Sequence, residues 1–121
     1  MDKYQALHSF WSGFCLVAYD ENTVPATAEM PYITYQAVGD TFDGNVLLSA
    51  SVWYHSMSWE AISQKVEEIS GAIGLGGSMT SYTGGALWVK RSSPFAQRMS
   101  DPDKNIRRIL LSVEVEYLSE N

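Results

Sequence analysis

The stretch from Val46 to Ile73 constrains the fold most, because a strand pattern and a helix pattern follow each other across a three-residue link. Residues 46–54 read VLLSASVWY and alternate with a period of two, which is typical of a strand with one buried face. A helix tethered this closely to a strand is expected to fold back on the strand face that begins with Val46. The helix is predicted from apolar residues that recur at spacings of three and four: Trp59, Ile62, Val66, Ile69 and Ile73.

Both ends of this helix carry sequence signals. Ser58 is expected to cap the N-terminus with its hydroxyl, and Glu60 lies in the first turn, where the helix dipole favours an anion. Gly74, Gly76 and Gly77 follow the last apolar position, and glycine tolerates the left-handed conformation that ends many helices. The helix is therefore expected to end at the glycines.

The N-terminal half predicts one more helix and a strand pairing. Residues 2–11 read as a helix with an apolar stripe, and residues 16–19 form a short extended segment that could be an edge strand. Residues 32–37 alternate as a strand. The Asp43-Gly44 pair that follows is a hairpin signal, so this strand is expected to pair antiparallel with the next one.

The C-terminal half predicts a second pair of strands. Residues 79–82 and 86–92 are expected to be extended, and residues 93–104 are expected to form a long polar loop. Residues 106–118 form the longest predicted strand. Its buried face is expected to carry five apolar residues: Ile109, Leu111, Val113, Val115 and Tyr117.

These elements predict an α+β domain of two layers. The second face of the sheet would be polar, so both helices are expected on the other face. The predicted fold is a mostly antiparallel β-sheet with two helices on one face, in the order α-β-β-α-β-β. The residues expected on the polar face are Thr34, Gln36, Ser49, Ser51, Ser112, Glu114 and Glu116.

Composition limits the possible functions. The net charge of −6 argues against a general nucleic-acid binder, but it does not exclude a protein past which DNA slides without binding. The single cysteine, Cys15, permits no internal disulfide and is expected to be a small buried residue. No apolar run reaches the roughly 20 residues of a membrane span, and the N-terminus lacks the order of a signal peptide. We therefore expect a soluble protein made in a reducing cytoplasm.

No group of residues predicts a catalytic, cofactor or metal site. The two histidines, His8 and His55, have no neighbouring nucleophile or ligand at a useful spacing. The glycines after the second helix resemble a phosphate loop only superficially, because such loops precede a helix, and a helix stop with a flexible turn is the preferred interpretation. Two acidic pairs do not match the spacing of a calcium loop and are expected to be solvated. These pairs are Asp40 with Asp43 and Asp101 with Asp103.

The order of the segments resembles that of a known family. An N-terminal helix precedes Leu16-Val17-Ala18-Tyr19, and a Pro-Tyr-Ile-Thr-Tyr run starts at Pro31. The strand that ends in Ser51-Val52-Trp53-Tyr54 leads through a polar corner into a long helix, and the last strand alternates acidic and apolar residues. The chain is similar, over nearly its whole length, to the small tail-terminator (tail-completion, head-to-tail joining) proteins of long-tailed bacteriophages and prophages.

The resemblance implies a single tail-terminator-like domain over residues 1–121. Such a subunit forms a homo-oligomeric ring, commonly a hexamer, at the head-proximal end of the virion tail after synthesis in the bacterial host cytoplasm. The ring stops elongation of the tail tube and joins tail to head. The implied partners are the tail tube protein and a head connector or neck protein, and DNA passes through without specific binding. No cofactor, membrane or enzymatic activity is implied.

The resemblance also turns several residues into candidates. The candidate subunit interface comprises Trp53, Trp88, Arg91, Arg98 and Arg107, and the candidate lumen or tube-contact loops carry Asp40, Asp43, Asp101 and Asp103. The tryptophans could equally be core or half-exposed sheet residues, and the arginines could be a scattered solvated set. The alternative functions are another neck or tail component, or a small ligand-binding or enzymatic domain.

Overall fold

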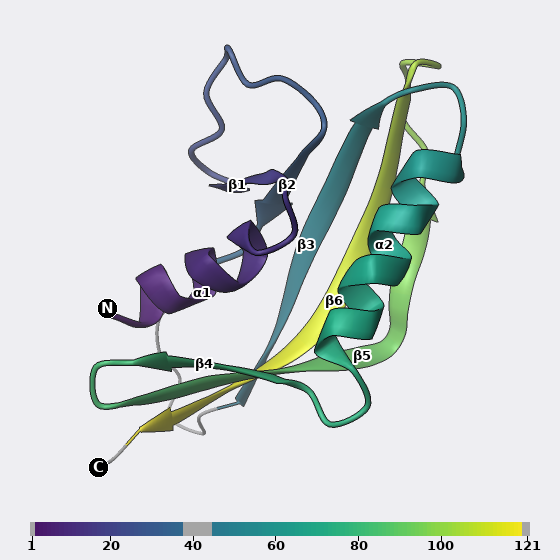
Figure 1. The fold of residues 1–121 in the computed structure, drawn as a ribbon. Helices are drawn as coiled ribbons and strands as arrows, with labels where there is room; N and C mark the ends of the chain where they lie inside the picture. The colour runs from purple at the N-terminus through teal and green to yellow at the C-terminus, as the bar shows by residue number, and fades with distance from the viewer. Residues whose placement is uncertain (1, 38–44, 120–121) are drawn as a thin grey trace.

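A computed structural model describes residues 2–37 and 45–119, which form two helices and a six-stranded sheet (Figure 1). The elements are α1 (Lys3–Ser12), β1 (Val17–Asp20), β2 (Tyr32–Tyr35), β3 (Asn45–His55), α2 (Glu60–Ile73), β4 (Ser78–Tyr82), β5 (Gly85–Met99) and β6 (Ile106–Ser119). The strand order is β1-β2-β3-β6-β5-β4. The β1–β2 pair is parallel and the other four pairs are antiparallel.

The predicted α+β class and mostly antiparallel sheet are confirmed, but the predicted element order is wrong. Each helix is followed by three strands rather than two, because β1 and β4 both join the sheet. They are its edge strands, with four and five residues. Segments this short carry little periodicity of their own, so the neighbouring strand decides whether they pair.

The strand β5 continues well beyond its predicted end at residue 92. It runs to Met99, so much of the predicted 93–104 loop is strand. The register with β6 shifts between Arg91 and Ala96, which face Val113 and Leu111 respectively. Proline cannot donate a ladder hydrogen bond, and this irregularity accommodates Pro94 without ending the strand.

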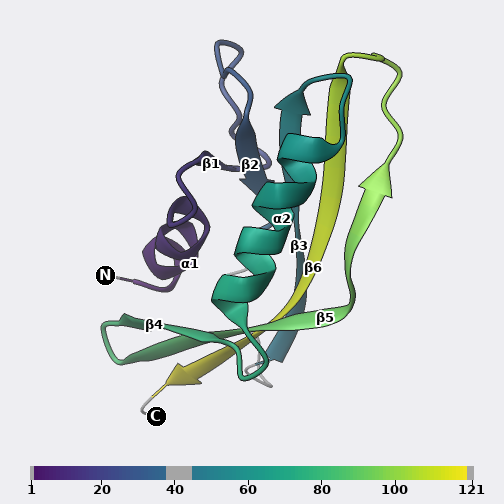
Figure 2. The same ribbon diagram turned by 45° about the vertical axis from the view of Figure 1, so that its right-hand side comes forward.

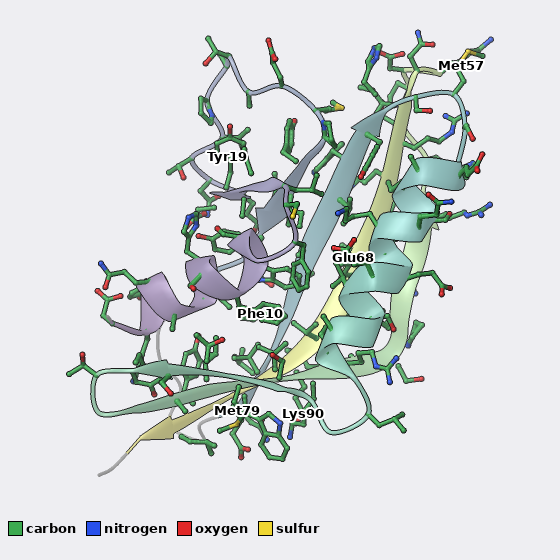
Figure 3. All side chains as sticks on the ribbon, in the orientation of Figure 1. Phe10, Tyr19, Met57, Glu68, Met79 and Lys90 are labelled. Atoms are coloured by element: carbon green, nitrogen blue, oxygen red, sulfur yellow. The ribbon has the colours of Figure 1, made fainter. Side chains whose placement is uncertain are left out.

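The hydrophobic core is formed by apolar residues of both helices and of the sheet. In α2, Ile62, Val66, Ile69 and Ile73 are buried as the stripe predicts, and Trp59 is half-buried. The helix packs on β3, β5 and β6, where the five predicted β6 residues are buried (Figure 2). From α1, Phe10 reaches the same core (Figure 3). Because the sheet curls, α1 contacts both edge strands, β1 and β4.

Two local predictions need correction. Helix α2 begins at Glu60 with Trp59 as its N-cap residue, which forms no side-chain cap, although the Ser58 hydroxyl accepts a hydrogen bond from the Glu60 N–H at 3.1 Å. The link between β3 and α2 is residues 56–59, one residue longer than predicted. Cys15 is exposed rather than buried. Its φ of 61° makes the turn from α1 to β1, so that Phe14 reaches the core and Cys15 remains in solvent.

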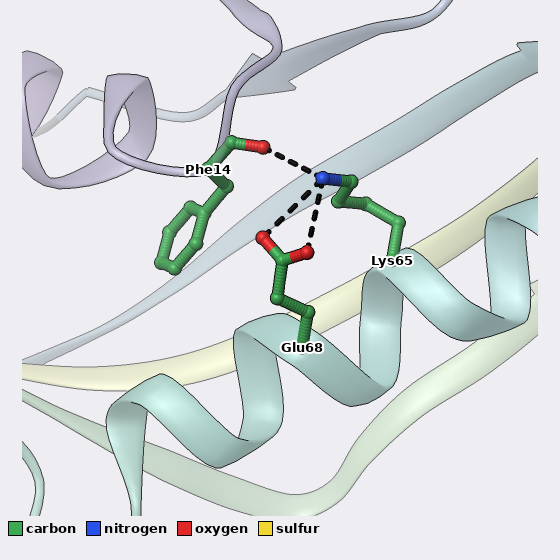
Figure 4. A network of polar contacts seen from close by, with 3 residues as sticks. All are labelled: Phe14, Lys65 and Glu68. Carbon is green, nitrogen blue, oxygen red and sulfur yellow. Dashed lines mark hydrogen bonds and ion pairs between the residues drawn. The ribbon is translucent and has the colours of Figure 1, made fainter.

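A lysine joins the two helical parts of the molecule. Lys65 Nζ, on α2, donates to the Phe14 carbonyl at 2.9 Å and pairs with Glu68 at 3.2 Å (Figure 4). The Lys65 side chain is 15% exposed and that of Glu68 is 53% exposed. The bond to Phe14 is therefore the better shielded of the two contacts and is expected to contribute more stability.

Replacing Lys65 with Met is expected to lower the free energy of unfolding by about 1.5 kcal/mol, because the Phe14 carbonyl loses a charged donor. Urea denaturation measures this change. The matched variant Glu68→Gln removes only the exposed ion pair and is expected to cost less than about 0.5 kcal/mol. Equal losses in the two variants would show that the ion pair, rather than the bond to Phe14, stabilises the junction.

Candidate assembly surface

The sheet face opposite the core, called the outer face here, carries the two candidate tryptophans. Trp53 and Trp88 are both half-buried and alternate with core residues along β3 and β5. The face is polar at Thr34, Ser49 and Glu114, as predicted, but it also presents aromatic and aliphatic side chains. These apolar groups fall into two areas, one at each end of β3.

The first area, called the aromatic row, consists of the neighbouring rings of Tyr19, Tyr32 and Trp53 and the guanidinium of Arg108. Tyr19 and Tyr32 meet edge to face with centroids 5.6 Å apart, and Tyr32 lies 6.3 Å from Trp53. The Arg108 guanidinium lies 4.8 Å from the Trp53 ring centroid, within cation–π range. The sheet register creates this row, because it places Tyr32 and Arg108 on either side of Trp53.

Hydrogen bonds hold the aromatic row in place. Trp53 Nε1 donates to the Thr34 hydroxyl at 2.9 Å, and Arg108 Nε donates to the Ser51 hydroxyl at 3.0 Å. Ser51 itself is only 4% exposed. Side chains that are ordered before binding lose little conformational entropy in a complex, so the row is suited to be a contact surface.

The second area surrounds Trp88 at the opposite end of β3. Trp88 Nε1 donates to the Gly76 carbonyl at 2.9 Å, and Lys90 Nζ lies 4.2 Å from its ring centroid. Met79 and Lys90 project away from both helices (Figure 3). Met79 pairs with Trp88 and is 57% exposed, and Leu47 is 70% exposed. Exposed apolar groups gathered in this way are typical of interaction surfaces.

The candidate arginines lie elsewhere, so the structure does not place the five interface candidates on one surface. Arg91 donates to the Ser70 hydroxyl of α2 at 2.7 Å. Arg98 and Arg107 flank the Trp59 ring, with guanidinium carbons 4.7 Å and 5.2 Å from its centroid. These side chains border a surface hollow, called the Trp59 hollow here. Its lining includes Met57, Trp59, Arg98, Asp101, Lys104 and Arg107.

Arg107 is built into the Trp59 hollow. One terminal nitrogen donates to the Met57 carbonyl at 2.7 Å, and the other to the Lys104 carbonyl at 3.1 Å. Its Nε is buried and has no hydrogen-bond partner among the described residues. Sequence reasoning assigned Trp59 only to the helix stripe and did not select Lys104. The clustering of cations between residues 98 and 108 was the available signal.

The acidic candidates divide into two groups. Asp101 and Asp103 support their own turn, because their carboxylates accept backbone N–H groups of Asp103 and Asn105 at 2.9 Å and 2.8 Å. Their role in a lumen or tube contact stays a prediction. Asp40 and Asp43 lie outside the described residues, as does the Asp43-Gly44 hairpin signal.

A histidine of α1 contacts a buried tyrosine of β2. His8 Nδ1 lies 2.9 Å from the Tyr35 hydroxyl, and burial, followed by the charge of Asp20, raises the Tyr35 pKa. Burial also raises the Tyr54 pKa. Among the described residues, no three His, Cys, Asp or Glu side chains are grouped to hold a metal ion. The described helices are also too short or too polar to span a membrane.

Comparison with known proteins gives one informative likeness. No protein-family model matches the chain, and no curated protein matches it. A chain in the solved structure described as "Virion of native gene transfer agent (GTA) particle" has a similar fold, with a TM-score of 0.61 and 16% sequence identity. The match covers 93% of this chain and 84% of that chain. At this identity the likeness shows a shared fold.

Proposed function

We propose that this protein is a structural component of a phage-like virion and acts there as a tail terminator. Copies of the chain form a ring, commonly a hexamer, on the head-proximal end of the tail tube, where the ring stops elongation and joins tail to head. The observation that carries the proposal is the fold shared with a chain of a gene transfer agent virion over 93% of this chain. The segment order along the sequence supports the same function.

The surface chemistry is consistent with assembly from several copies. The aromatic row and the exposed side chains around Trp88 offer ordered apolar area on the outer face, as ring and tube contacts require. The net charge of −6 suits a lumen through which DNA passes, because a negative wall repels phosphates. The partners in this proposal are further copies of the chain, the tail tube protein and a head connector or neck protein.

A tube-polymerisation assay tests the terminator role. Purified tail tube protein is polymerised with and without this chain, and tube lengths and ends are measured by negative-stain electron microscopy. A terminator is expected to give shorter tubes with a ring at one end. Another neck or tail component, which the virion likeness supports equally well, would bind its connector and leave tube length unchanged. Tubes of unchanged length would overturn the terminator role. The broader proposal, that the protein is a structural component of a virion, would still stand.

Replacing Trp53 with Ala is expected to weaken ring assembly by about tenfold or more, because the centre of the aromatic row is lost. Light scattering across a concentration series measures assembly, and circular dichroism checks the fold. Tyr4→Ala is the matched control, because Tyr4 is an exposed aromatic residue on α1. A folded Trp53→Ala chain that assembles like the wild type would exclude the aromatic row from the interface.

A further inference from the structure

The charges of this chain are strongly segregated along the sequence. Six of its eight Lys and Arg residues fall between residues 90 and 108: Lys90, Arg91, Arg98, Lys104, Arg107 and Arg108. Residues 4–64 contain no Lys or Arg and six acidic residues: Asp20, Glu21, Glu29, Asp40, Asp43 and Glu60. In an acidic protein with one basic segment, that segment can attract an acidic surface of a second copy.

Part of each charge group lies in a connection between two strands, and these two connections are on opposite sides of β3. Arg98, Lys104 and Arg107 lie around the turn that joins β5 to β6. Glu21 and Glu29 lie in the segment that joins β1 to β2, towards the other edge of the sheet. Figures 1 and 2 show both connections at the same end of the molecule, with β3 between them. Two copies side by side can therefore bring one connection against the other.

The Trp59 hollow has the chemistry to bind carboxylates. Arg98 is exposed and lies over the Trp59 ring, and Lys104 is exposed beside it. Arg107 donates to three backbone carbonyls, so it supplies positive charge at a fixed position, and Arg98 is the exposed guanidinium that can bind a carboxylate. Guanidinium groups bind carboxylates through two parallel hydrogen bonds, which makes Arg the preferred residue for such contacts. The Asp101 carboxylate in the hollow already accepts a backbone N–H.

The acidic side offers carboxylates that are not engaged within the chain. Glu21 and Glu29 are both exposed. Within the described residues, neither side chain forms a hydrogen bond or an ion pair, whereas Asp20 accepts the Asn22 N–H at 2.9 Å. A contact that uses Glu21 and Glu29 therefore breaks no existing interaction.

We infer that the Trp59 hollow of one copy receives the Glu21 and Glu29 carboxylates of the next copy in the ring. The contact is head-to-tail, so each copy uses its basic side towards one neighbour and its acidic side towards the other. Such a heterologous contact closes into a ring when the rotation between copies permits it. This inference rests on the proposed ring and adds the surfaces and the chemistry that hold it together.

Charge exchange tests the contact. Arg98→Glu, and separately the double variant Glu21→Lys with Glu29→Lys, are each expected to weaken ring formation about tenfold or more. The triple variant that carries all three changes is expected to recover part of the loss, because the carboxylate introduced at position 98 then faces the two introduced ammonium groups, whereas Lys104 and Arg107 stay positive. Ring mass is measured by sedimentation velocity in solution and by electron microscopy on tail tubes. Raising the salt concentration is expected to weaken the wild-type ring.

Controls separate the inference from the function on which it rests. Glu67→Lys makes the same change, from a negative to a positive side chain, at an exposed position of α2 outside the inferred contact. This variant is expected to leave the ring intact. Lys104→Glu replaces Arg98→Glu if that variant fails to fold, as judged by circular dichroism. Rings that form normally in the reversed variants would overturn this contact and leave the terminator function standing. A wild-type chain that forms no ring, in solution or on tubes, would overturn both.

Discussion

Replacing Trp11 with Ala is expected to lower the free energy of unfolding by about 4 kcal/mol, the largest loss of any single change proposed for this chain. Trp11 is 1% exposed, and its ring meets Phe10 edge to face with centroids 4.8 Å apart. Removing the indole leaves a cavity under α1, which contacts both edge strands of the sheet. The change should therefore loosen β1 and β4 together. Chemical denaturation followed by circular dichroism measures it.

The control for Trp11 lies on the same helix. Tyr4 is 58% exposed, and Tyr4→Ala is expected to change the free energy of unfolding by less than about 0.5 kcal/mol. Hydrogen exchange on the Trp11→Ala chain should show faster exchange in β1 and β4 than in β3 and β6. A uniform increase across the sheet would instead mean that α1 stabilises the whole domain rather than its edges.

Replacing Gly77 with Ala is expected to cost about 3 kcal/mol, because the new methyl group has no room and the backbone conformation is strained. Gly77 has a φ of +85°, a value that residues with a Cβ rarely adopt. An added Cβ would lie 2.4 Å from Trp88 Nε1 and 2.7 Å from the Val89 carbonyl oxygen. The Val89 oxygen belongs to the backbone, so β4 and β5 would have to move apart.

The neighbouring glycine provides the matched control. Gly76 has no atom within 4 Å of an added Cβ, and its φ is not positive. Gly76→Ala is therefore expected to fall within about 0.5 kcal/mol of the wild type in a denaturant titration. Because the Trp88 indole lies where a Cβ at position 77 would be, Gly77→Ala should also shift the tryptophan fluorescence of the folded state. A Gly77→Ala chain as stable as Gly76→Ala would show that the turn relaxes without disturbing Trp88.

The candidate site was only partly predictable from sequence. Alternation in β3 and β5 was sufficient to direct Trp53 and Trp88 away from the core, and both lie on the outer face. The sequence could not show that Arg98 and Arg107 flank Trp59, since they lie 39 and 48 positions after it. Nor could it show that Arg108 stacks on Trp53, which depends on the β3–β6 register.

Periodicity in the amino-acid sequence was sufficient to predict the α2 helix, the strands β3 and β6 and the class of the fold. Each of these elements is long enough for its periodicity to report which face is buried, and the stripe of α2 matches the apolar face of β3. Three features depend on the packing of distant segments: the parallel β1–β2 pair, the position of β4 at the far edge and the continuation of β5 past Pro94. This packing was not predictable from local pattern. It also decided that Cys15 faces solvent. Periodicity is a property of neighbouring residues and can be read from a short stretch of sequence. Short edge strands and cation–ring contacts form between residues far apart in the sequence, so they depend on how the whole chain folds.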